Sequence, residues 1–124
     1  MVANLEQTPL STDYLQQIQE QYAHITPDGE DDMEWWNEGL NLIDQGNLDQ
    51  AEKRFKMLVM SQPDNFDGYQ GLAMVYAKLN RLEEALYFSN LAVDKATKLH
   101  KEGYIDQAVL GHVQKTGSVE FQVG

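Results

Sequence analysis

Apolar residues recur every three or four positions along most of this chain, which is the spacing of one face of an α-helix. The pattern predicts six helices, which cover residues 13–22, 33–45, 48–60, 66–79, 83–101 and 105–115. The end departs from this spacing in another way, because Val119, Phe121 and Val123 alternate with polar residues as in a strand. We therefore expect helix 105–115 to end at Lys115-Thr116-Gly117 and to be followed by a loose or edge-binding tail.

One turn sequence returns along the chain. Residues 46–51 read GNLDQA, and residues 80–85 read NRLEEA at an offset of 34 positions. Gly and Asn both accept the left-handed backbone that ends a helix. A third copy, GYIDQA at residues 103–108, follows only 23 positions after Asn80. This spacing predicts a truncated third repeat, whose first helix is fused to a long helix from Glu83 to Lys101 and whose second helix alone remains.

The first repeat carries a recognisable set of residues. Small residues let two helices approach closely, and an aromatic residue fills the space beside them. The set consists of Trp35, Gly39, Leu42, Ala51, Phe55 and Pro63. It resembles the tetratricopeptide repeat, a 34-residue helical hairpin. The chain departs from the family pattern at Glu38, where Leu is usual, and at Ser89 and Thr97, where Phe and Pro are usual.

The resemblance spans about residues 32–114 and implies an all-α fold, a right-handed superhelical stack of antiparallel helix pairs. We expect a polar segment with a short amphipathic helix over 1–31, a repeat domain over 32–115 and a tail over 116–124. The repeats are 32–65, 66–99 and a truncated 100–115. The first and last helices would cap the two ends of this α-solenoid.

In this family the first helix of each hairpin lines a groove that binds a peptide or a partner helix. The resemblance implies a groove lined by Trp36, Leu40, Ile43, Asp44, Gln70, Met74, Ala77 and Lys78. The Lys and Asn clamp that family members use to hold a terminal carboxylate is absent. We therefore expect an adaptor or assembly factor that binds an amphipathic or basic segment of another protein rather than an acidic tail.

Two alternatives concern the same surface. The helix with Leu15, Ile18 and Tyr22 has an apolar stripe that must be buried, and it could fill the groove in cis. Two hairpins bury little core, so the chain could also be a structural module that forms a homodimer through an uncapped face.

Charge is distributed unevenly along the chain, whose net charge is -11. Residues 1–52 contain twelve acids and no Lys or Arg, whereas residues 53–124 contain eight acids and nine bases. An acidic half repels phosphate backbones, so a nucleic-acid partner is not expected. It would attract a basic protein surface, although acids also simply keep a small protein soluble.

Composition limits the chemistry. The 124 residues include no Cys, no apolar run that could span a bilayer and no visible secretory signal, so we expect a cytoplasmic protein without membrane insertion. No catalytic residues, cofactor or metal site are expected, because no nucleophile, phosphate or dinucleotide motif is present. The acidic run Asp28, Glu30, Asp31, Asp32 and Glu34 leaves calcium binding as an alternative, although its spacing differs from an EF-hand loop.

Overall fold

The computed structural model describes residues 14–27 and 33–123, with side chains from Glu34 onward in the second range and up to Lys115. These residues form six helices and no strand, which confirms the all-α prediction. The helices are α2 (Tyr14–Gln21), α3 (Met33–Asp44), α4 (Leu48–Ser61), α5 (Asp67–Lys78), α6 (Leu82–Lys101) and α7 (Gln107–Val123). Within the described ranges, no helix is both long enough and apolar enough to cross a membrane.

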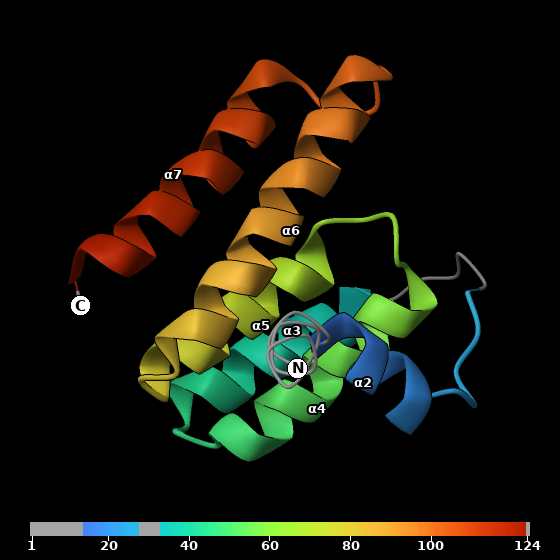
Figure 1. The fold of residues 1–124 in the computed structure, drawn as a ribbon, viewed down its shortest axis with the longest axis vertical. Coiled ribbons are helices and arrows are strands. Elements are labelled where there is room, and N and C mark those ends of the chain that lie inside the picture. Colours follow the sequence, from blue (N-terminus) through green and yellow to red (C-terminus); the bar gives the residue numbers. More distant parts are fainter. Residues whose placement is uncertain (1–13, 28–32, 124) are drawn as a thin grey trace, which may run out of the picture.

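The helices from α3 to α7 pack in chain order, each against the one before it (Figure 1). In addition, α5 contacts α3, and α7 contacts α5. α7 therefore packs on α6 and α5 as α5 packs on α4 and α3. α5 is the first helix of the second hairpin. The expectation that the third unit keeps only its second helix is wrong: α7 is a first helix, and it follows the long α6 directly. The right-handed superhelix stays a prediction.

Three helices end in the same way. Gly46, Asn80 and Gly103 have positive φ angles of 79°, 62° and 86°. In each case the next residue donates its backbone N–H to a carbonyl five positions earlier, the arrangement of a Schellman cap. These hydrogen bonds are Asn47 N to Leu42 O at 2.8 Å, Arg81 N to Tyr76 O at 2.8 Å and Tyr104 N to Leu99 O at 2.9 Å. The turn sequence thus encodes a helix stop, whichever helix comes next.

Phe55 is the centre around which three helices meet. It is fully buried on α4 between Gly39 of α3 and Gly71 of α5. A Cβ atom at Gly39 would lie 2.4 Å from the Phe55 ring, and one at Gly71 would lie 2.3 Å from it. Because real Cβ contacts are never so short, both positions require glycine for this packing. The predicted role of Gly39 is confirmed, and Gly71 is its counterpart in the second hairpin.

The long α6 agrees with the sequence prediction and α7 does not. α6 spans Leu82–Lys101, because Thr97 replaces the proline that ends the corresponding helix at Pro63. The expected end of the last helix at Lys115-Thr116-Gly117 is wrong, as is the strand-like tail, because α7 continues to Val123. Three alternating apolar residues do not specify a strand when no partner strand lies among the described residues.

Candidate functional site

Eight residues of α3 and α5 are expected from the sequence to line a groove, and we call them the α3–α5 face. Four come from each helix, and the two helices contact one another. Their positions differ in burial. Trp36, Leu40, Ile43, Met74 and Ala77 are half-buried, Gln70 is buried, and Asp44 and Lys78 are exposed at the ends of their helices. The face is therefore a partly exposed apolar strip with one acid and one base at its edge.

Trp36 belongs to this face and to the core at once. Its ring lies 5.6 Å from the Phe55 ring, centroid to centroid, at an interplanar angle of 59°. Such tilted aromatic pairs contribute stability beyond the area they bury. Only part of the indole is therefore available to a partner. Gln70 is still less available, since its exposed fraction is 8%.

The departure from the family pattern at Glu38 has a structural explanation. Arg54 of α4 donates from its Nε atom to Glu38 Oε1 at 2.7 Å. The side chains of Arg54 and Glu38 are 36% and 40% exposed, so this ion pair lies at the edge of the first hairpin. It holds α3 to α4 at a place where a leucine would otherwise be packed, with a small net contribution to stability.

A polar cluster that sequence reasoning missed joins α4 to the end of α5. Tyr76 donates its hydroxyl to Glu52 Oε2 at 2.5 Å, and Lys56 Nζ lies 3.1 Å from the same oxygen. The Arg81 guanidinium lies over the Tyr76 ring at 4.7 Å from its centroid. Tyr76 and Glu52 are separated by 24 positions on different helices, and no local pattern links such residues.

The cluster changes the ionisation of its members. Burial alone would raise the pKa of Glu52, but hydrogen bonds from Tyr76 and Lys56, with the charges of Lys56 and Arg81, outweigh it and lower the pKa. Burial and then the hydrogen bond to Glu52 raise the pKa of Tyr76. Glu52 is thus a stable carboxylate and Tyr76 a stable hydroxyl donor near neutral pH.

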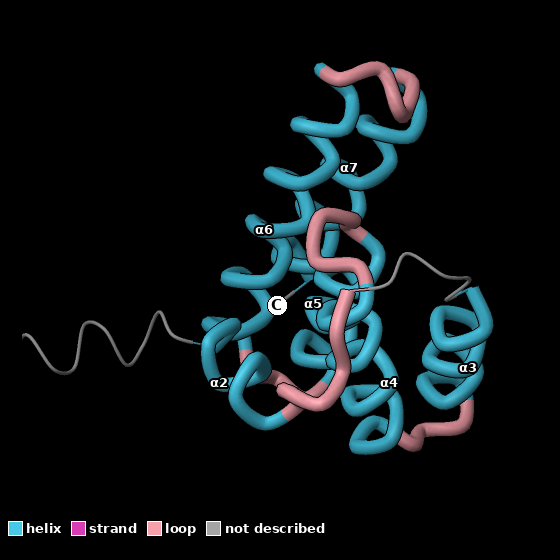
Figure 2. Tube along the Cα trace, turned by 90° about the vertical axis from the view of Figure 1, so that its right-hand side faces the viewer, coloured by secondary structure: helices cyan, strands magenta, loops and turns pink. Residues whose placement is uncertain are grey.

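α2 lies on the second helices of the hairpins and not on the α3–α5 face. It contacts α4, and Tyr14 packs its ring at 5.1 Å from Tyr87 and 6.3 Å from Phe88 of α6. Figure 2 shows α2 and α3 on opposite sides of α4 and α5. The hypothesis that this helix fills the groove in cis is therefore wrong, because α2 packs on α4 and its Tyr14 ring packs on α6, on the other side of the hairpins (Figure 2).

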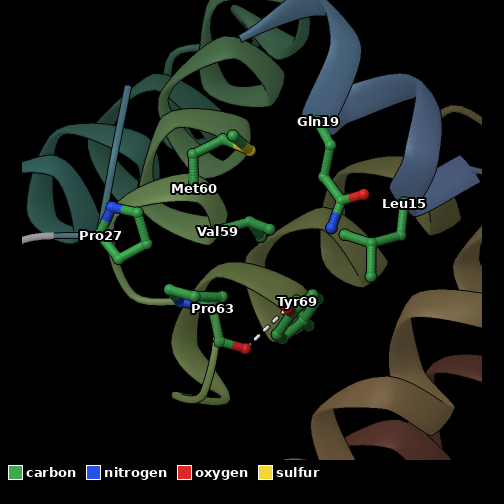
Figure 3. Close-up of a pocket in the computed structure, with 7 residues that line it drawn as sticks. All are labelled: Leu15, Gln19, Pro27, Val59, Met60, Pro63 and Tyr69. Carbon is green, nitrogen blue, oxygen red and sulfur yellow. Dashed lines mark hydrogen bonds between the residues drawn. The ribbon is translucent and has the colours of Figure 1, made fainter. Parts of the chain in front are cut away.

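A pocket of about 110 Å³ lies beside α2, close to the turn between α4 and α5 (Figure 3). Its lining is mostly apolar and consists of Leu15, Gln19, Pro27, Val59, Met60, Pro63 and Tyr69. Tyr69 donates its hydroxyl to the Pro63 carbonyl at 2.7 Å, and burial raises the pKa of Tyr69 to about 12. None of the eight residues of the α3–α5 face lines this pocket.

The acidic run considered for calcium lies mostly outside the described residues, since 28–32 are not among them. Among the side chains described in residues 14–27 and 34–115, no group of three His, Asp or Glu could hold a metal ion.

Comparison with known protein families assigns the central part of the chain. Residues 42–98, slightly under half of the chain, match the tetratricopeptide repeat. The match begins near the end of α3 and continues through most of α6. It therefore contains all of α4 and α5 and most of α6. It supports assignment to the tetratricopeptide repeat family. Comparisons with curated proteins and with solved structures give no match.

Proposed function

We propose that this protein is an adaptor or assembly factor that binds another protein through the α3–α5 face. Tetratricopeptide repeats are protein–protein interaction modules, and the match over residues 42–98 carries that general conclusion. The finer assignment, to this face, is our proposal. The observation that supports it most is the position of α2, which leaves the partly exposed apolar strip of α3 and α5 uncovered by that helix.

The chemistry of the face favours an amphipathic partner segment. Its half-buried apolar side chains can receive the apolar side of a helix, which binds through residues spaced three or four apart. Methionine and tryptophan are enriched in such contacts, and the face offers Met74 and the exposed part of Trp36. Several such side chains, desolvated together, would supply most of the binding energy.

Charge favours a basic partner surface on the α3 side. Among the described residues from Glu34 to Glu52 there are five acids and no Lys or Arg. Asp44 is the exposed acid of the face itself, and Lys78 at the matching place on α5 is its single base. Complementary charges steer association more than they add affinity. The same distribution disfavours nucleic acid as a direct partner.

The experiment that tests this function is affinity capture with the full chain. Asp44→Lys changes an exposed residue at the last position of α3, where a base suits the helix dipole, so folding should be preserved. The matched control is Asp94→Lys, an exposed acid on α6 away from the face. We expect a protein that is captured by the wild type and by Asp94→Lys to be depleted with Asp44→Lys. Equal capture by all three would reject the α3–α5 face as the binding surface.

A further inference from the structure

We propose that the pocket beside α2 is a binding site for a small aromatic molecule that carries one hydrogen-bonding group. The site is separate from the α3–α5 face, so this inference does not rest on the proposed function. Its first support is size. The pocket holds about 110 Å³. An engineered apolar cavity of about 150 Å³ in another protein binds benzene, so a single ring is the appropriate scale here.

The walls of the pocket favour a ring. Pro27 and Pro63 present flat apolar surfaces, and Met60 presents a flexible thioether, which makes favourable contacts with aromatic groups (Figure 3). Leu15 and Val59 add branched aliphatic side chains to the wall, and the pocket stays partly open to solvent. A chain molecule of the same volume would lose rotational freedom on entering, whereas a rigid ring loses little.

One side chain gives the pocket a polar preference. Gln19 extends from α2 into the pocket, and its carboxamide offers both a donor and an acceptor (Figure 3). The Tyr69 hydroxyl already donates to the Pro63 carbonyl. The Tyr69 hydroxyl is neutral near pH 7 and adds no negative charge to the pocket, and burial, which raises its pKa to about 12, keeps it neutral at alkaline pH too. A neutral ligand with a single hydroxyl or amide group therefore matches the site best.

Binding would also tie α2 to the rest of the molecule. The pocket is built from α2 on one side and from α4 and the start of α5 on the other. A ligand that contacts both sides stabilises their association, and the stabilisation grows with ligand concentration.

The test uses phenol and benzene as probes on the full chain with labelled methyl groups. Saturable chemical-shift changes are expected at Leu15, Val59 and Met60 with both probes. Leu82 and Leu86, which are exposed on α6, report non-specific contact and should not change. Changes at all leucines alike, or changes that never saturate, would overturn the proposal.

Two variants test separately whether the ligand occupies the pocket and whether it forms a hydrogen bond with Gln19. Leu15→Phe should fill the pocket and weaken phenol binding at least tenfold, whereas Leu86→Phe, a matched change on an exposed leucine, should leave it unaltered. Gln19→Leu changes an exposed residue and should weaken phenol binding several-fold while leaving benzene binding intact. Unchanged phenol binding in Gln19→Leu would refute the proposed preference for a ligand with a hydrogen-bonding group. This variant remains informative if Leu15→Phe folds poorly.

Discussion

Trp36 and Phe55 pack ring against ring across the first hairpin, with centroids 5.6 Å apart. The contact joins the α3–α5 face directly to the glycine-lined centre of the core, because Phe55 also fills the space left by Gly39 and Gly71. A residue that the family resemblance assigns to partner contacts is therefore also a structural one. This dual role determines which variants can test binding without disturbing the fold.

Trp36→Ala should lower both stability and partner binding. The truncation removes an aromatic contact and leaves space beside Phe55, so we expect a loss of about 1–3 kcal/mol in the free energy of unfolding. Chemical denaturation of the full chain measures this loss. An unchanged unfolding midpoint would show that the indole is a pure surface contact, contrary to its position against Phe55.

Gly71→Ala should destabilise the fold although alanine is the better helix former. Its Cβ would lie 2.3 Å from Phe55 Cδ1, and relief of that overlap should cost about 1–3 kcal/mol. Gly111→Ala on α7 is the matched control, because a Cβ there meets nothing within 4 Å. In that open position the same substitution should stabilise by up to about 1 kcal/mol. If both variants behave alike in denaturant titrations, the role of Phe55 as the spacer between α3 and α5 is refuted.

Asn80 occupies the left-handed position that ends α5, with φ of 62°. Asn80→Ala should cost about 1 kcal/mol, since a Cβ without a local hydrogen-bonding group is disfavoured there. Asn80→Gly should be neutral or slightly stabilising for the same reason. Thermal unfolding of the two variants against the wild type checks the order, and a reversed order would contradict the cap geometry.

The contribution of Glu52 to stability should depend on pH. Its pKa is lower in the folded state, so the carboxylate stabilises the fold above its ordinary pKa of 4.5, and this stabilisation is lost as the pH falls through the lower folded value. Tyr76→Phe removes the hydroxyl that donates to Glu52 and should cost about 1–2 kcal/mol at neutral pH. The deficit should shrink as the pH falls through the lowered pKa of Glu52 and the carboxylate is protonated. Unfolding titrations at about pH 7 and at a series of acidic pH values measure this change; a deficit that stays constant down to acid unfolding would disprove the link to Glu52.

Much of this architecture could be predicted because local chemistry encodes it. The turns at Gly46, Asn80 and Gly103 end helices through residues that accept positive φ, and the apolar spacing gives the helices between them. The same local chemistry misleads in one respect. A Schellman cap ends a helix without specifying the role of the next helix, so the turn pattern alone places Gly103 in the middle of a hairpin, although it joins α6 to a new first helix.

The candidate site was less predictable, since it depends on contacts between distant segments. An amphipathic stripe indicates that α2 must be buried, but it does not indicate where, and the ring of Tyr14 finds Tyr87 more than seventy positions away. The hydrogen bond between Tyr76 and Glu52 and the wall that Leu15 contributes to the pocket arise in the same way. Neither leaves a periodic signal in the sequence.

The most direct test of the α3–α5 face is the dissociation constant of a captured partner, measured by calorimetry with two matched methionine variants. Met74 lies on the face and Met57 lies on α4 away from it, and both side chains are half-buried. Met74→Ala should weaken binding about tenfold, which corresponds to about 1.4 kcal/mol, whereas Met57→Ala should change it less than about twofold. Equal dissociation constants for the wild type and Met74→Ala, or a larger loss with Met57→Ala, would contradict the proposed binding surface.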